Sequence, residues 1–287
     1  MLKKYISAIA AAAFIFSLNG GTAEAKGQNS IQIKGSDTMV NLVQGWAEEF
    51  MKKNPNAFFA VTGGGSGTGL AAMINGTCDI AVSSREISKK EIALANKRGV
   101  EPKEYKVALD GLAVVVNVGN PVSTLSMDQL ADIFSGKIKN WNEVGGPDKK
   151  IVVLSREVNS GTHVYFKEHV LRKGDPKSRE EFSPEALMLS SSQAIADEVK
   201  HNASAIGYYG MGYIGKDHKP IAVSVAGAEA AEPTIDNVVK NIYPISRPLF
   251  IYINGEPKDF VKDFMNYILS PEGQSIVEKM DFVPVQR

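Results

Sequence analysis

Thr62-Gly63-Gly64-Gly65-Ser66-Gly67-Thr68-Gly69 is the stretch around which this chain is organised. The apolar run 58–61 precedes it and the apolar run 70–74 follows it, so the pattern predicts a strand, a glycine turn and the start of a helix. The first N–H groups of a helix have no partner within the helix and carry partial positive charge. Glycines allow a ligand to approach the backbone closely, and Ser66 and Thr68 add hydroxyl donors. The stretch therefore predicts a cradle for an oxyanion, although taken alone it also fits a flexible loop.

The glycine turn does not match the nucleotide-binding templates. No lysine follows the glycines, as a Walker A loop requires, and no three of them have the spacing of a dinucleotide fingerprint. The pattern therefore favours a small anion over a nucleotide.

Two further units repeat the order of strand, polar turn and helix. One has Ile31-Gln32-Ile33, then Gly35-Ser36-Asp37-Thr38-Met39, then a helical pattern up to Asn54. The other has Ile80-Ala81-Val82, then Ser83-Ser84-Arg85, then a helix from about Ser88 to Lys97. Each polar turn also has a plainer interpretation, as a helix cap or a surface turn. Three such units in succession predict an α/β lobe with a mostly parallel sheet, whose ligands bind beyond the carboxyl ends of the strands.

A fourth unit supplies an arginine. Strand 151–154 leads to Ser155-Arg156-Glu157-Val158-Asn159-Ser160-Gly161-Thr162 and a helix over 163–171. The planar guanidinium of Arg156 suits two-pronged contact with phosphate or carboxylate oxygens. Ser160, Thr162 and the backbone N–H groups of Gly161 and Thr162 can donate to the same oxyanion. The alternative is an ordinary helix cap beside a surface arginine.

Two long apolar runs, 107–117 and 249–253, read as buried strands that cross between lobes. The tail is predicted to form helices over 258–269 and 271–279 that pack back on the first lobe. A length of 287 residues suffices for two modest cores.

The first 25 residues have the pattern of a secretory signal peptide. Lys3 and Lys4 precede an apolar run from Ile6 to Leu18, and Ala23-Glu24-Ala25 predicts cleavage after Ala25. The apolar run is short for a membrane anchor. No cysteine lies near the cleavage site to accept a lipid, so we expect a periplasmic protein and not a lipoprotein.

Several function classes find no support in the sequence. The 32 Lys and Arg residues balance 32 Asp and Glu residues, so there is no excess of positive charge for nucleic-acid binding. Neither Ser66 nor Ser160 lies in a G-x-S-x-G motif, and the four histidines form no metal-ligand pattern. We therefore expect no enzyme, no catalytic residue, no metal and no cofactor.

The sequence resembles the periplasmic phosphate-binding proteins of Pst-type ABC phosphate importers over nearly the whole mature chain. The resemblance rests on Gly35-Ser36-Asp37-Thr38, Gly65-Ser66-Gly67-Thr68-Gly69, Arg156-x-x-Asn159-Ser160-Gly161-Thr162, and the segment from Leu125 to Trp141. It implies an α/β fold of the type II periplasmic-binding class, in which two lobes joined by two crossover strands close on phosphate. We expect a signal peptide at 1–25, one lobe formed by 26–112 and 250–287, and a second lobe formed by 113–249.

The resemblance also implies partners: inorganic phosphate and the membrane permease subunits of an ABC phosphate importer, bound by a monomer. In the family, backbone amides, hydroxyls and one arginine bind dehydrated phosphate. The turns and the resemblance together predict a ligand site made of Ser36, Asp37, Thr38, Met39, Gly65, Ser66, Gly67, Thr68, Ser84, Arg85, Arg156, Ser160, Gly161 and Thr162.

One position departs from the family pattern. Well-known members carry an aspartate where this chain has Ser84, and that aspartate accepts the proton that phosphate retains. Sulfate has no such proton, so a carboxylate repels it. Asp37 is the nearest replacement, and Arg85 could add a second cation. Three alternatives therefore stay open: a binding protein for sulfate, molybdate or tungstate, an exported phosphohydrolase, and an added adhesion or signalling role.

Overall fold

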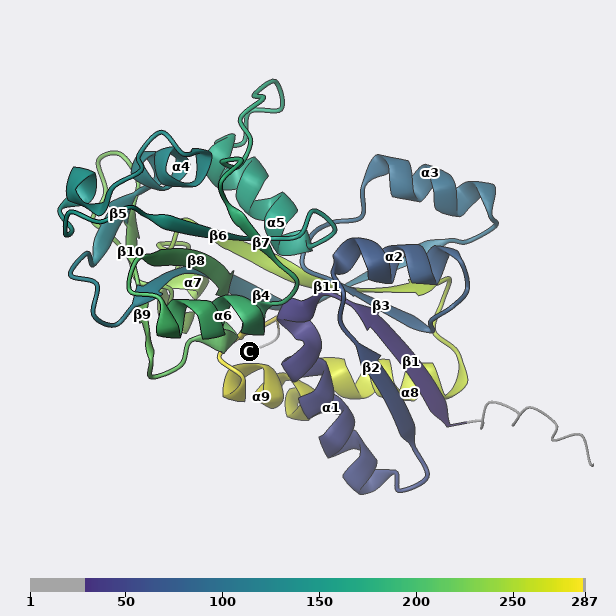
Figure 1. The fold of residues 1–287 in the computed structure, drawn as a ribbon. Helices are drawn as coiled ribbons and strands as arrows, with labels where there is room; N and C mark the ends of the chain where they lie inside the picture. The colour runs from purple at the N-terminus through teal and green to yellow at the C-terminus, as the bar shows by residue number, and fades with distance from the viewer. Residues whose placement is uncertain (1–28, 286–287) are drawn as a thin grey trace, which may run out of the picture.

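The computed structural model describes residues 29–285, so the predicted signal peptide at 1–25 lies outside the described residues. A ten-stranded sheet with the main order β2-β1-β3-β11-β4-β8-β6-β7 runs through two lobes (Figure 1). Among the helices of residues 29–285, none combines the length and the apolar character needed to cross a bilayer.

The first lobe follows the predicted succession of strand–turn–helix units. Strands β1 (Ser30–Gly35), β2 (Phe58–Thr62) and β3 (Ile80–Ser83) are parallel, with β1 between the other two. Each leads into a helix: α1 (Val40–Lys53), α2 (Ser66–Ile74) and α3 (Lys89–Lys97). Helix α3 begins with a capping box, in which Ser88 and Glu91 exchange side-chain and backbone hydrogen bonds. All three turns therefore open at the same edge of the sheet.

Two antiparallel strands, β4 (Pro102–Asn117) and β11 (Ser246–Asn254), join the lobes. Strand β4 pairs with β11 as far as Gly111 and, from Leu112 on, with β8 (Ala205–Gly210). Both strands are longer than the predicted runs 107–117 and 249–253, because their ends carry polar and charged residues that an apolar pattern does not include.

The second lobe contains the fourth unit. Strand β6 (Val152–Arg156) leads to α5 (Gly161–Phe166), and a π-helical turn (Lys167–Leu171) continues it. The polar turn is shorter than predicted, since Arg156 still belongs to the strand. The lobe also contains helices α4 (Met127–Ser135) and α6 (Ser192–His201). Several short elements were not predicted from the sequence, namely β5 (Thr124–Ser126), β7 (Leu187–Leu189), β9 (His218–Pro220), β10 (Ala222–Ser224), α7 (Ile235–Val239) and β12 (Val283–Pro284).

Each lobe has its own aromatic core. Trp46 and Phe50 of α1 pack with Phe264 of α8 (Asp259–Leu269) in the first lobe. The indole N–H of Trp46 donates to the Gly273 carbonyl in α9 (Pro271–Lys279) at 2.8 Å. The tail helices therefore pack on the first lobe, as predicted. In the second lobe, the main core includes Phe134, Trp141, Phe166 and Tyr208.

Gly69 lies inside α2, where alanine is ordinarily the better residue by about 1 kcal/mol. Here an added Cβ would lie 2.4 Å from the Lys34 carbonyl oxygen of β1, which is closer than a carbon and an oxygen that are not bonded can approach. We expect Gly69→Ala to lower the free energy of unfolding by about 1–3 kcal/mol, as overpacking does, when measured by urea denaturation.

Gly45→Ala in α1 is the matched control, because the atom its Cβ would meet is the flexible end of Met280. If the two variants have equal free energies of unfolding, α2 and β1 do not pack as closely at Gly69 as the structure shows.

Candidate functional site

The first turn brings Thr38 to the boundary between the lobes. Thr38 and Met39 lie in a short 3₁₀ helix (Asp37–Met39) directly after β1 and are buried. The Thr38 hydroxyl lies 3.0 Å from the hydroxyl of Thr162, at the start of α5 in the second lobe. The Met39 amide donates to the Ser36 carbonyl, so in this state it closes the turn.

The glycine turn brings Ser66 to the same boundary. Ser66 is fully buried, and its hydroxyl oxygen accepts the Ser84 amide N–H at 3.0 Å and lies 3.3 Å from the Ser84 hydroxyl. Gly161 of the second lobe faces this pair so closely that a Cβ there would lie 2.3 Å from the Ser66 hydroxyl oxygen. Glycine at 161 is what allows the two helix starts to meet.

Ser160 caps the start of α5. Its hydroxyl oxygen accepts the amide N–H groups of Thr162 at 3.2 Å and His163 at 3.4 Å. The plain capping interpretation therefore holds for Ser160, whose hydroxyl hydrogen can still be donated.

Arg156 is buried beside the site and largely occupied. Its Nε donates to the Leu189 carbonyl, its Nη1 to the Ser192 hydroxyl, and its Nη2 to the Ser190 carbonyl. Nη2 also forms a 2.7 Å ion pair with Asp37 of the first lobe.

Asp37 has partners other than those the sequence suggested. One carboxylate oxygen accepts from Arg156, and the other accepts the Gly64 amide N–H at 3.0 Å. The Tyr213 hydroxyl donates to its carbonyl at 2.6 Å. In this structure Asp37 joins the lobes and orders the glycine turn, and its role as a proton acceptor for phosphate stays a prediction.

Asn159 holds the rest of the glycine turn and was missed as a site residue. Its carbonyl accepts the Gly67 amide N–H at 3.0 Å, and its side-chain amide donates to the Gly64 carbonyl at 2.9 Å. A weaker bond from the same amide reaches the Thr68 hydroxyl at 3.3 Å. Gly65 packs against the Asn159 carbonyl, where a Cβ would lie 2.7 Å away. The predicted donors Gly67 and Thr68 thus contact the other lobe.

A second buried ion pair, between Asp110 on β4 and Arg247 on β11, was also missed. Arg247 Nε and Nη2 donate to one Asp110 oxygen at 3.1 and 2.9 Å. Nη2 also reaches the Thr162 hydroxyl at 3.0 Å and the Thr38 hydroxyl at 3.3 Å. Burial raises the pKa of Asp110, and the charge of Arg247 opposes that effect. The available signal was one aspartate within the apolar run that forms the second half of β4.

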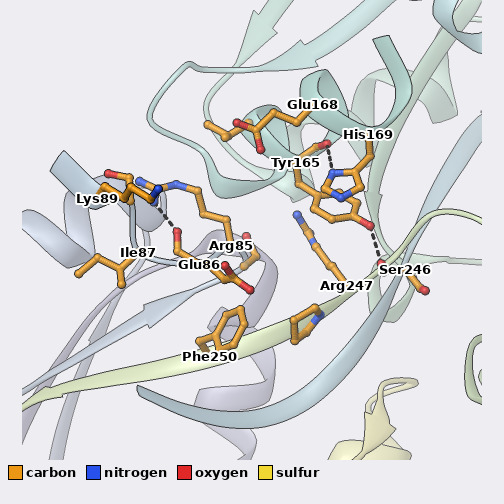
Figure 2. Close-up of a pocket in the computed structure, with 14 residues that line it drawn as sticks. Arg85, Glu86, Ile87, Lys89, Tyr165, Glu168, His169, Ser246, Arg247 and Phe250 are labelled. Carbon is orange, nitrogen blue, oxygen red and sulfur yellow. Dashed lines mark hydrogen bonds between the residues drawn. The ribbon is translucent and has the colours of Figure 1, made fainter. Parts of the chain in front are cut away.

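Arg85 lies farther out. Its guanidinium forms a two-pronged ion pair with Glu91, at 2.9 and 2.8 Å. It lines a cleft of about 690 Å³ that reaches inward along β11 to Ser84 and Arg247, with Tyr165 and His169 on the opposite wall (Figure 2). Arg85 therefore belongs to the wall of this cleft, while its charge is matched locally.

The arrangement as a whole suits an oxyanion. Hydroxyls of Thr38, Ser66, Ser84 and Thr162 and the guanidinium of Arg247 converge where the lobes meet. These groups are removed from water, where hydrogen bonds to a charged ligand are strong. Within residues 29–285, no three His, Cys, Asp or Glu side chains are grouped as metal ligands.

The chain is similar to a known domain family and to named proteins. Residues 20–272 match a PBP superfamily domain. The phosphate-binding protein PstS of Bacillus subtilis is 35% identical over 266 residues, which cover 91% of this chain and 83% of that protein. PstS of Pseudomonas aeruginosa is 32% identical over 269 residues, covering 88% and 81%.

Solved structures are also similar. A Clostridium perfringens substrate-binding protein with bound phosphate has a TM-score of 0.80 at 34% identity, covering 90% of this chain and 100% of that one. An ABC-type phosphate transport receptor from Vibrio cholerae has a TM-score of 0.68 at 31% identity, covering 88% and 99%.

His163, next to the site on α5, gives a prediction about pH. Burial, with a smaller effect of Lys167, lowers the pKa of His163 to about 4. An unfolded histidine takes up its proton near pH 6.5, so the unfolded state binds more protons between these values. Stability should therefore fall as the pH drops from about 6.5 to about 4.

Urea denaturation across this range should show a flatter profile for His163→Gln than for the natural chain. His201→Gln, at an exposed position, is the control. Parallel profiles for His163→Gln and the natural chain would contradict the buried neutral imidazole.

Proposed function

Because this chain belongs to the PstS family of phosphate-binding proteins in the PBP superfamily, we propose that it captures inorganic phosphate between its lobes and delivers it to an ABC importer. The observation that carries the proposal is the meeting of donors from both lobes. Thr38, Ser66 and Ser84 come from the first lobe, and Gly161 and Thr162 from the second. An anion that enters between Thr38 and Thr162 would replace their hydroxyl–hydroxyl contact with bonds from each to its own oxygens.

We divide the chain into lobes at the point where β4 changes partners. One lobe is formed by 26–112 and 250–287 and the other by 113–249, with β4 and β11 as the hinge. The change from β11 to β8 between Gly111 and Leu112 supports this division. We propose that hydroxyls and helix-start amides contact the phosphate directly, and that Asp37, Asn159 and Arg156 also hold the lobes together around it.

The family consists of substrate-binding proteins, and we propose that this chain has no catalytic activity of its own. We also propose that it is exported by cleavage after Ala25, acts as a monomer outside the cytoplasm without a lipid anchor, and meets the permease subunits of an importer there. A second candidate function is the binding of another tetrahedral oxyanion. It is suggested by Ser84, which stands where the family has an aspartate.

Calorimetry with phosphate and sulfate tests the proposed function. We expect one-to-one binding of phosphate and at least about 10-fold weaker binding of sulfate, a difference of about 1.4 kcal/mol. Phosphate should also raise the thermal midpoint in proportion to the logarithm of its concentration. Tight binding of sulfate, molybdate or tungstate without phosphate would identify a different anion, and release of phosphate from a chromogenic phosphoester would identify a hydrolase.

The Asp37–Arg156 ion pair predicts coupling between the lobes. We expect Asp37→Asn and Arg156→Gln each to weaken phosphate binding by about 1.5–3 kcal/mol, because each leaves a charged partner without its mate. Since both changes remove the same contact, the double variant should lose less than the sum, with a coupling energy of about 1–3 kcal/mol.

Lys52→Gln, which breaks an exposed ion pair with Glu49 in α1, is the control and should leave the affinity unchanged. Additive losses in the double variant would show that Asp37 and Arg156 do not act through each other.

A further inference from the structure

Two buried guanidinium groups border the phosphate site, and counting their N–H groups separates their roles. An arginine has five N–H donors. Arg156 uses four of them, on Leu189, Ser192, Ser190 and Asp37. One N–H on its Nη1 is left for a ligand.

Among the described residues, Arg247 has hydrogen-bond partners on only one side of its guanidinium group. Its Nε and Nη2 donate to Asp110, Thr38 and Thr162. Its Nη1 has almost no exposed area and no hydrogen-bond partner among residues 29–285. A charged donor left without an acceptor in the interior costs more free energy than an unpaired neutral donor does. Two N–H groups of one buried cation therefore await an acceptor.

The position of Arg247 places this nitrogen at the anion site. The side chain is 2% exposed and lies at the inner end of the cleft, which Ser84 also lines. Figure 2 shows its guanidinium directed into the space between Arg85 and Tyr165. The Tyr165 ring lies 5.5 Å from the guanidinium carbon, within the range of a cation–π contact. Through Nη2 the same group already contacts the site hydroxyls of both lobes.

We propose that Arg247 contacts the bound phosphate directly through Nη1, in addition to the one N–H group that Arg156 has left for a ligand. The inference rests on the proposed function. It assigns to phosphate a second cationic partner, Arg247, which lies on β11, one of the two strands that join the lobes. Asp110 fixes the orientation, because it occupies the Nε–Nη2 side of the guanidinium and Met211 donates its amide to the other Asp110 oxygen at 3.1 Å. The Nη1 side is thereby left to the ligand.

Calorimetry on charge-matched variants tests the proposal. Arg247→Gln alone leaves Asp110 as a buried carboxylate without its charged partner, which is strongly destabilising, so the decisive variant combines Arg247→Gln with Asp110→Asn. Its fold is checked by circular dichroism and by the thermal midpoint without anion. We expect the phosphate dissociation constant to rise at least about 100-fold, as for loss of a buried charged contact. Lys89→Gln, which removes an exposed cation of the same cleft, should change the phosphate dissociation constant less than about 2-fold.

A spectroscopic readout separates contact from positioning. In protein labelled with 15N-arginine, the guanidinium signals that are absent from Arg247→Lys belong to Arg247. Saturation with phosphate should shift these signals, because the Nη1 hydrogens gain an acceptor.

The outcomes distinguish this proposal from the proposed function. If the natural chain binds phosphate but the folded double variant binds within about 3-fold of it, Arg247 is not a ligand contact and the function stands. If the Arg247 signals do not shift at saturation with phosphate, Arg247 is likewise not a ligand contact. If the natural chain binds neither phosphate nor sulfate, both proposals fail together.

Discussion

The ion pair between Asp110 and Arg247 is the interaction on which the site depends. The two residues lie directly opposite each other on β4 and β11, one position before β4 changes its partner from one lobe to the other. Buried ion pairs add little net stability, because the loss of hydration offsets most of their attraction. The Asp110–Arg247 pair matters because it fixes the orientation of the guanidinium. It holds a guanidinium at the junction of the lobes, in contact with Thr38 of one lobe and Thr162 of the other.

The polar turns could be read from the sequence because their signals are local. A strand that ends in glycine, serine and threonine before a helical pattern specifies the turn and the helix start within about ten residues. The capping box of Ser88 and Glu91 and the positions of α1 and α6 follow from the same local patterns. Their convergence followed from the parallel order of β1, β2 and β3, which brings successive turns to one edge.

The contacts between the lobes could not be read in this way. Arg247 and Asp110 are 137 residues apart, and Asn159 meets Gly64 across 95 residues, so no periodicity connects them. The ion pair between Arg156 and Asp37 was therefore not predicted, although each residue was assigned to the site separately. Asp110 gave the one usable hint, since a carboxylate within a buried strand requires a partner.

Gly161 has a consequence of a different kind. The atoms that would collide with a side chain at this position are the hydroxyl oxygens of Ser66 and Ser84, and both belong to the other lobe. The collision therefore exists only while the lobes are together, and it vanishes in any arrangement in which they separate. A side chain at position 161 would therefore raise the free energy of the closed arrangement alone and shift the empty protein towards separated lobes.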